Sequence, residues 1–112
     1  MKCNDQEVIF AIVNAGFAED VMEIARSQGA RGGTILDARG VVREEAAAFF
    51  GITLHREKEV LMIVVPKEIR DQILNAIYRE SGKKAGCFTF SVPVSDVAGL
   101  GLPQPEAPAE LT

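Results

Sequence analysis

The sequence has few of the residues that carry acid-base or metal chemistry in proteins. It contains two cysteines, Cys3 and Cys87, without a CxxC pair, and a single histidine, His55. Neither cysteine has the neighbours of a zinc site, so both are expected to be reduced thiols. A single histidine, with no nucleophile and base placed together, leaves little general-base chemistry near neutral pH. We therefore expect neither an enzyme nor a metal site, and His55 is expected to be a surface residue of a loop.

The chain also lacks an excess of positive charge and any long apolar run. Its 12 lysines and arginines are outnumbered by 16 aspartates and glutamates, which gives a formal net charge of -4. A general nucleic-acid binder would usually present a basic face, so no nucleic acid is expected as a partner. No apolar run approaches the roughly 20 residues needed to span a bilayer, and "MKCNDQEVIF" lacks the core of a signal peptide. One cytoplasmic domain is the expectation for 112 residues.

The patterns that are present predict alternating strands and helices. Short runs rich in β-branched and aromatic residues are typical of strands, and apolar residues at helical spacing follow the first and third of them. We expect strands at residues 8–13, 32–38, 60–65 and 87–94, one helix that Gly29 ends, and a second helix that Pro66 opens and Gly82 ends. Residues 41–57 are expected to be a long loop, with one helical turn at 44–50.

This order predicts a ferredoxin-like βαββαβ fold of the α+β class, a four-stranded antiparallel sheet with two helices on one face. The strands are apolar on both sides, and the second face has no helix to cover it. We therefore expect that face to be buried against other copies of the chain. Residues 1–100 are expected to form the domain, and residues 101–112, which include several prolines, a flexible tail.

Three stretches in order resemble the PII signal-transduction family, the nitrogen regulatory proteins. They are "GARGGTILDARG" (29–40), "KEVLMIVVP" (58–66) and "SGKKAG" (81–86), which leads into "FSVPVSDV". The resemblance covers roughly residues 7–100. It implies a homotrimer with small-molecule effectors in the clefts between subunits. The loop 41–57 would correspond to the family's T-loop, which docks on partner proteins. It is shorter than in typical members and contains no tyrosine for uridylylation, so the chain resembles a divergent member.

The resemblance also implies site residues. The glycines allow a ligand to approach the backbone closely, and the two adjacent lysines supply charge for an anion. The implied ligand-binding residues are Thr34, Arg39, Gly40, Gly82, Lys83, Lys84, Ala85 and Gly86. The implied partner contacts in the loop are Val42, Arg43, Glu44, Phe49 and Phe50.

Two departures from the family pattern bear on the ligand. Family members that bind ATP tightly have a lysine after the glycine turn, where this chain continues Gly86, Cys87, Phe88. They also have two arginines after the last strand, where this chain reads "AGLGLP" (98–103). Each charge-assisted contact is worth about 1.5–3 kcal/mol. Tight binding of ATP is therefore not expected, and an adenine nucleotide of lower charge, or a similar small anion, is the candidate effector.

Structural explanations stand beside these functional ones. The stretch 28–40 can be read as a glycine-capped helix end followed by a strand, and Lys83 and Lys84 as solvated residues that stabilise a helix dipole. The leading hypothesis is a non-enzymatic regulator of a membrane transporter or a metabolic enzyme. The alternatives are a trimer that resembles the divalent-cation tolerance proteins, or an interaction scaffold that works without a ligand.

Overall fold

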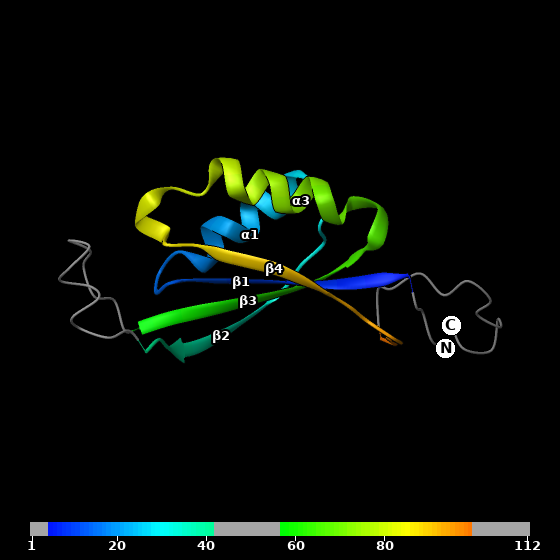
Figure 1. The fold of residues 1–112 in the computed structure, drawn as a ribbon, viewed down its shortest axis with the longest axis horizontal. Coiled ribbons are helices and arrows are strands. Elements are labelled where there is room, and N and C mark those ends of the chain that lie inside the picture. The colour runs from blue at the N-terminus through cyan, green and yellow to red at the C-terminus, as the bar shows by residue number, and fades with distance from the viewer. Residues whose placement is uncertain (1–4, 42–56, 100–112) are drawn as a thin grey trace.

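Two helices cover one face of a four-stranded sheet in the computed structural model, which describes residues 5–41 and 57–99 (Figure 1). The strand order is β2-β3-β1-β4, and all neighbouring strands are antiparallel. This arrangement confirms the ferredoxin-like fold predicted from the sequence. The elements are β1 (Gln6–Asn14), α1 (Ala18–Ser27), β2 (Thr34–Arg39), β3 (Glu57–Pro66), α3 (Lys67–Glu80), the short 3-10 helix η1 (Lys83–Ala85) and β4 (Phe88–Pro93).

The strand boundaries differ from the predicted ones by a few residues. β2 begins at Thr34, two residues later than predicted. The preceding Gly33 passes so close to β3 that a Cβ there would lie 2.9 Å from the carbonyl oxygen of Met62. β3 begins at Glu57 rather than Val60, so the charged residues before the apolar run are already part of the sheet. The predicted helical turn at 44–50 and the tail 101–112 lie outside the described residues.

The two helices end in different ways. Gly29 has φ of +108°, and its N–H donates to the carbonyl oxygen of Arg26 at 3.0 Å, which confirms the predicted glycine cap of α1. The expectation for Gly82 is wrong: α3 ends at Glu80, its C-cap is Ser81, whose N–H donates to Ile77 O at 3.0 Å, and Gly82 has an ordinary φ of -74°. Neither helix in the described part of the chain is long and apolar enough to cross a membrane.

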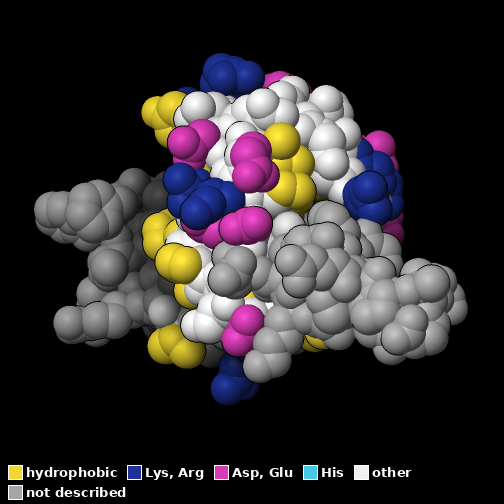
Figure 2. Space-filling view, turned by 90° about the vertical axis from the view of Figure 1, so that its right-hand side faces the viewer, with side chains coloured by type: hydrophobic (Ala, Val, Ile, Leu, Met, Phe, Trp, Pro, Cys, Tyr) yellow, Lys and Arg dark blue, Asp and Glu magenta, His cyan; other side chains and the backbone are white. Residues whose placement is uncertain are grey.

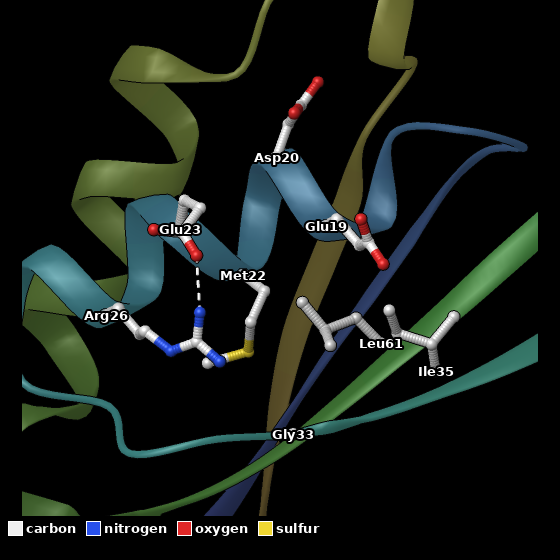
Figure 3. Close-up of a pocket in the computed structure, with 8 residues that line it drawn as sticks. All are labelled: Glu19, Asp20, Met22, Glu23, Arg26, Gly33, Ile35 and Leu61. Atoms are coloured by element: carbon white, nitrogen blue, oxygen red, sulfur yellow. Dashed lines mark hydrogen bonds and ion pairs between the residues drawn. The ribbon is translucent and has the colours of Figure 1, made fainter.

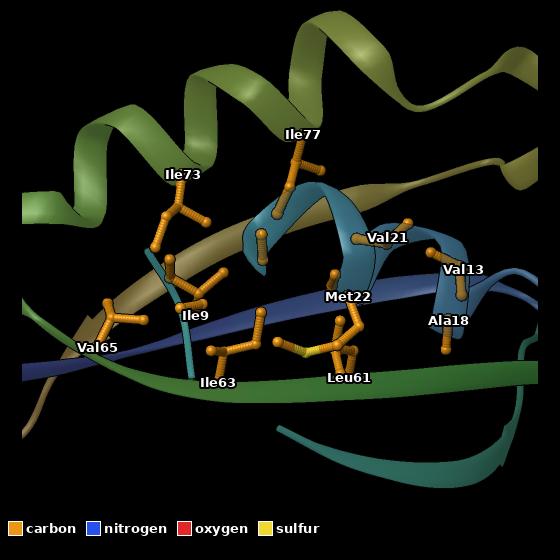
Figure 4. Packing of buried hydrophobic residues seen from close by; sticks show 13 residues of the cluster. Ile9, Val13, Ala18, Val21, Met22, Leu61, Ile63, Val65, Ile73 and Ile77 are labelled. Atoms are coloured by element: carbon orange, nitrogen blue, oxygen red, sulfur yellow. The ribbon is translucent and has the colours of Figure 1, made fainter. Parts of the chain in front are cut away.

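The core lies between the sheet and the helices (Figure 4). Alternate residues of β1 and β3 point toward the helices and are fully buried, whereas their neighbours point to the other face. The apolar faces of the amphipathic helices α1 and α3 cover the core on the side opposite the sheet. Its largest fully buried side chains are Ile9, Val13, Val21, Leu61, Ile63, Val65, Ile73 and Ile77.

The opposite face of the sheet is apolar and carries no helix (Figure 1). Phe10 at its centre lies opposite Met62 on one side and Phe90 on the other, and the rings of Phe10 and Phe90 stack with centroids 5.2 Å apart. Several side chains of this face are exposed in the single chain, including Leu36, Val64, Phe88 and Val92. Such an apolar surface is typical of a protein interface. The predicted apolar character of the uncovered face is confirmed.

Candidate functional site

Most of the predicted ligand residues gather at one end of the sheet. At this end β2 finishes with Arg39, which Gly40 follows, β3 begins at Glu57, and β1 finishes at Asn14. The turn 82–86, which contains η1, lies at the same end, just before β4 (Figure 1, left). The flanks of the predicted partner loop and the predicted anion-binding turn therefore lie at the same end of the subunit.

A chain of contacts joins the two flanks of the loop to the turn. The side-chain amide of Asn14 donates from Nδ2 to the carbonyl oxygen of Lys84 at 2.9 Å and accepts from Lys58 Nζ at Oδ1, at 2.7 Å. The stem of Lys58 in turn packs on Gly40, where a Cβ would lie 3.0 Å from Lys58 Cε. The sequence prediction missed Asn14 and Lys58. The available signal was a polar residue directly after an apolar strand and a lysine within a charged run.

The turn itself is built by hydrogen bonds of its own backbone. The N–H groups of Ala85 and Gly86 donate to the carbonyl oxygens of Gly82 and Lys83 at 3.1 and 3.2 Å. Ala85 is buried and anchors the turn, whereas the lysines beside it are exposed. Because two amides are used inside the turn, the charge that a ligand would meet comes mainly from the side chains of Lys83 and Lys84.

A hollow of about 490 Å³ opens beside the turn, between the end of α3 and β4. Burial raises the pKa of its half-buried Cys87, and a hydrogen bond with Ser81 opposes this only in part. The lining thus combines apolar, hydroxyl and cationic groups. It consists of Ile77, Tyr78, Ser81, Gly82, Lys83, Gly86, Cys87, Phe88 and Thr89.

Thr34 does not lie near the turn within one chain. It is at the start of β2, on one edge of the sheet, whereas the turn leads into β4 on the other edge. In the register of the strands Thr34 lies opposite Met62, on the uncovered face. Strands in a sheet are about 4.8 Å apart, so the two intervening strands put β2 and β4 about 14 Å apart. A single subunit therefore does not assemble the whole predicted ligand set.

The predicted partner contacts Val42, Arg43, Glu44, Phe49 and Phe50 lie outside the described residues, as does His55. Their position on a surface loop stays a prediction.

A second hollow, of about 400 Å³, lies between α1 and β2 (Figure 3). Its rim carries Glu19, Asp20 and Glu23, and Arg26 is paired with Glu23. Its floor is formed by Met22, Leu61 and Ile35, together with the backbone of Gly33. An acidic rim with its one arginine already paired is unfavourable for an anion, and none of the predicted ligand residues lines this hollow.

The far end of the subunit presents acidic and basic side chains in mixed order over the helix layer (Figure 2). One of its ion pairs is partly buried: Arg70 donates to the carboxylates of Glu7 at 2.7 Å and Asp71 at 2.9 Å. These hydrogen bonds, the one to Glu7 first, raise the pKa of Arg70. The charge of Arg70 is thus balanced within the subunit.

Comparison with known proteins agrees with this architecture. A family model described as nitrogen regulatory protein P-II matches residues 6–100, whereas sequence comparison with curated proteins finds no match. The structure of Arabidopsis thaliana PII bound to citrate is 25% identical, with a TM-score of 0.64 over 88% of this chain and 82% of that chain. CPII from Thiomonas intermedia K12, bound to ADP, AMP and acetate, is 13% identical, with a TM-score of 0.61 over 84% and 89% of the two chains.

A PII-like signaling protein from Thermus thermophilus is 18% identical, with a TM-score of 0.60 over 80% of this chain and 85% of that chain. The two relatives of lower identity show the fold. The family match goes further, because residues 6–100 include every described strand and helix, from the start of β1 to the end of β4. The chain therefore belongs to the nitrogen regulatory protein P-II family.

Proposed function

We propose that this protein is a homotrimeric regulator that senses a small anionic ligand between its subunits and controls a partner protein through residues 41–57. Proteins of the P-II family are signalling regulators rather than enzymes. The observation that carries the proposal is the contact chain from Gly40 through Lys58 and Asn14 to Lys84. It joins both flanks of the loop to the lysine-bearing turn, so that a ligand at the turn can influence the loop.

The position of Thr34 supports a ligand site that is shared between chains. Thr34 and the turn 82–86 belong to opposite edges of one sheet. Packing of the uncovered apolar faces would bring an edge of one subunit near the opposite edge of the next. In that arrangement Thr34, Arg39 and Gly40 of one chain face Gly82 to Gly86 of another, and the ligand is held in the cleft between them.

The charge available at the turn points to the class of ligand. The relatives with bound molecules contain citrate in one case and ADP, AMP and acetate in the other. Here Lys83 and Lys84 provide two positive charges on exposed side chains. Two charges balance a nucleoside monophosphate or diphosphate better than ATP, whose additional charge would have no partner there. We therefore propose AMP or ADP, or a small anion of similar charge, as the effector.

The proposed partner is inferred from the way the family uses the loop that corresponds to residues 41–57. We propose that Val42, Arg43, Glu44, Phe49 and Phe50 contact a membrane transporter or a metabolic enzyme. Ligand binding at the turn would then change how residues 41–57 meet that partner.

Calorimetric titration of AMP, ADP, cyclic AMP and ATP tests the site. The wild-type protein should bind AMP or ADP more tightly than ATP, and Lys83→Ala/Lys84→Ala should weaken that binding about tenfold or more. Lys67→Ala, which removes an exposed lysine at the other end of the sheet, is the matched control and should bind as the wild type does. Tight ATP binding that the double variant leaves unchanged would contradict the site. No binding of any nucleotide would instead favour the ligand-independent scaffold.

A further inference from the structure

Asn14 is not among the predicted site residues, yet it links two of the predicted functional segments. It is the last residue of β1, it is 8% exposed, and its amide hydrogen-bonds Lys84 and Lys58, which lie 70 and 44 residues away along the chain. One partner belongs to the turn of the proposed ligand site, and the other to the beginning of β3, just after the proposed partner loop. A single side chain thus bridges the two functional segments.

The chemistry of the two partners fixes the orientation of this amide. A lysine ammonium group can only donate, and a peptide carbonyl oxygen can only accept. Lys58 therefore needs Asn14 Oδ1, and the carbonyl of Lys84 needs Asn14 Nδ2. Rotation of the amide by half a turn would break both bonds at once. If Lys58 or Lys84 moves, the amide of Asn14 can follow only by weakening its bond to the other lysine, as expected for a shared hydrogen-bond network.

The beginning of β3 is held to the same corner by further contacts. The N–H of Ala15 donates to the carbonyl oxygen of Glu57 at 3.1 Å. Glu59 accepts from the N–H groups of Gly16 and Ala18 at 3.0 and 3.1 Å. Residues 57–59 therefore rest on the segment that directly follows Asn14, so a shift of Asn14 is felt along the whole start of β3.

We propose that Asn14 is a positioning residue that couples the turn 82–86 to residues 57–59 at the end of the partner loop. The proposal rests on the proposed function for its biological meaning, because it supplies the path from ligand to loop. The coupling itself is a property of the free protein and is measured without a ligand.

Amide hydrogen exchange of the ligand-free protein tests the coupling. Lys58→Met removes one partner of Asn14 and leaves the Asn14–Lys84 bond possible. Exchange at residues 83–86 should nevertheless become about three- to tenfold faster, while exchange in the middle of α3 stays as in the wild type. Lys67→Met is the matched control and should change neither segment. Equal exchange at 83–86 in Lys58→Met and Lys67→Met would overturn the proposal.

Substitutions of Asn14 separate its two bonds. Asn14→Asp keeps the acceptor for Lys58 but loses the donor to Lys84, so it should speed exchange at 83–86 more than at 57–59. Asn14→Leu loses both bonds and should speed exchange in both segments by a similar factor. Asn14→Gln carries the same groups and should restore part of the protection that Asn14→Leu loses. Identical exchange profiles for Asn14→Asp and Asn14→Leu would speak against the assigned bonds.

A second arm adds ADP as the probe. In the wild type, saturating ADP should slow exchange at 83–86 and at 57–59, whereas in Asn14→Asp it should slow exchange at 83–86 alone. Equal slowing at 57–59 in both proteins would overturn the coupling. If the wild type binds no ADP, the proposed nucleotide site is wrong, and the ligand-free exchange of the Lys58 and Asn14 variants still decides the proposal for Asn14.

Discussion

The backbone of Gly86 lies directly against the side chain of Asn14: a Cβ on Gly86 would be 2.8 Å from Asn14 Nδ2 and 3.3 Å from its Cγ. Gly86 also has φ of +56°, in the left-handed region that favours glycine. Two independent reasons, space and backbone conformation, therefore require glycine at this end of the turn. The amide that holds Lys84 and Lys58 is seated on this glycine.

Substitution of Gly86 should accordingly be costly. Gly86→Ala should lower the free energy of unfolding by about 1–3 kcal/mol, because it strains the backbone and pushes on Asn14. Gly82→Ala, four residues earlier, is the matched control: φ there is -74° and nothing lies within 4 Å of the added Cβ. Urea unfolding of the two variants measures the difference. Equal midpoints would show that the turn adapts to a side chain at 86.

Glu59 provides the cap that α1 lacks in its own sequence. The N-cap residue Phe17 makes no side-chain cap, and Glu59 on β3 instead accepts from the N–H groups of Gly16 and Ala18. Glu59→Ala should cost about 1 kcal/mol of stability, as loss of an N-cap does. Glu59→Gln should cost less, because its amide oxygen still accepts. Thermal unfolding of the variants measures the order of their stabilities. Glu57→Ala serves as the control, because the side chain of Glu57 is exposed.

The fold could be predicted from the sequence because the separate local patterns all specify the same arrangement of strands and helices. The apolar alternation of β1 and β3, and the stripe with Ile73 and Ile77 on α3, specify which faces meet. The contacts of Asn14 could not be predicted in the same way. An asparagine at a strand end is ordinarily a turn residue, and its partners lie far along the chain. Similarly, nothing in the sequence showed that Thr34 and the turn 82–86 lie on opposite edges of one sheet.

The uncovered sheet face should hold the subunits together. Phe88 is 64% exposed on this face, so replacing it should cost the isolated subunit little while placing a charge in the proposed interface. Phe88→Asp should convert a trimeric wild type to monomers at micromolar concentration. Tyr78→Asp is the comparison, because Tyr78 is 85% exposed and belongs to α3, in the helix layer rather than on that face.

Sedimentation analysis of the three proteins distinguishes the outcomes. A wild type that is already monomeric would contradict the homotrimer. Dissociation by Tyr78→Asp as well as Phe88→Asp would show that the interface includes the helix layer.

Cys87 should make stability depend on pH in the alkaline range. Burial raises the pKa of its thiol above the ordinary value of 9.0, so the folded protein retains the proton to higher pH than the unfolded chain does. The stability that this contributes is complete below the unfolded pKa and is lost as the pH rises through the folded pKa.

In a Cys3→Ser background with one thiol, thiolate absorbance should therefore appear above pH 9.0 in the folded protein and near pH 9.0 in urea. Cys87→Ala should lose less stability than the parent between about pH 8 and about pH 10. Equal losses in the two proteins, or a folded thiol that ionises as readily as the unfolded one, would contradict the assigned burial of Cys87.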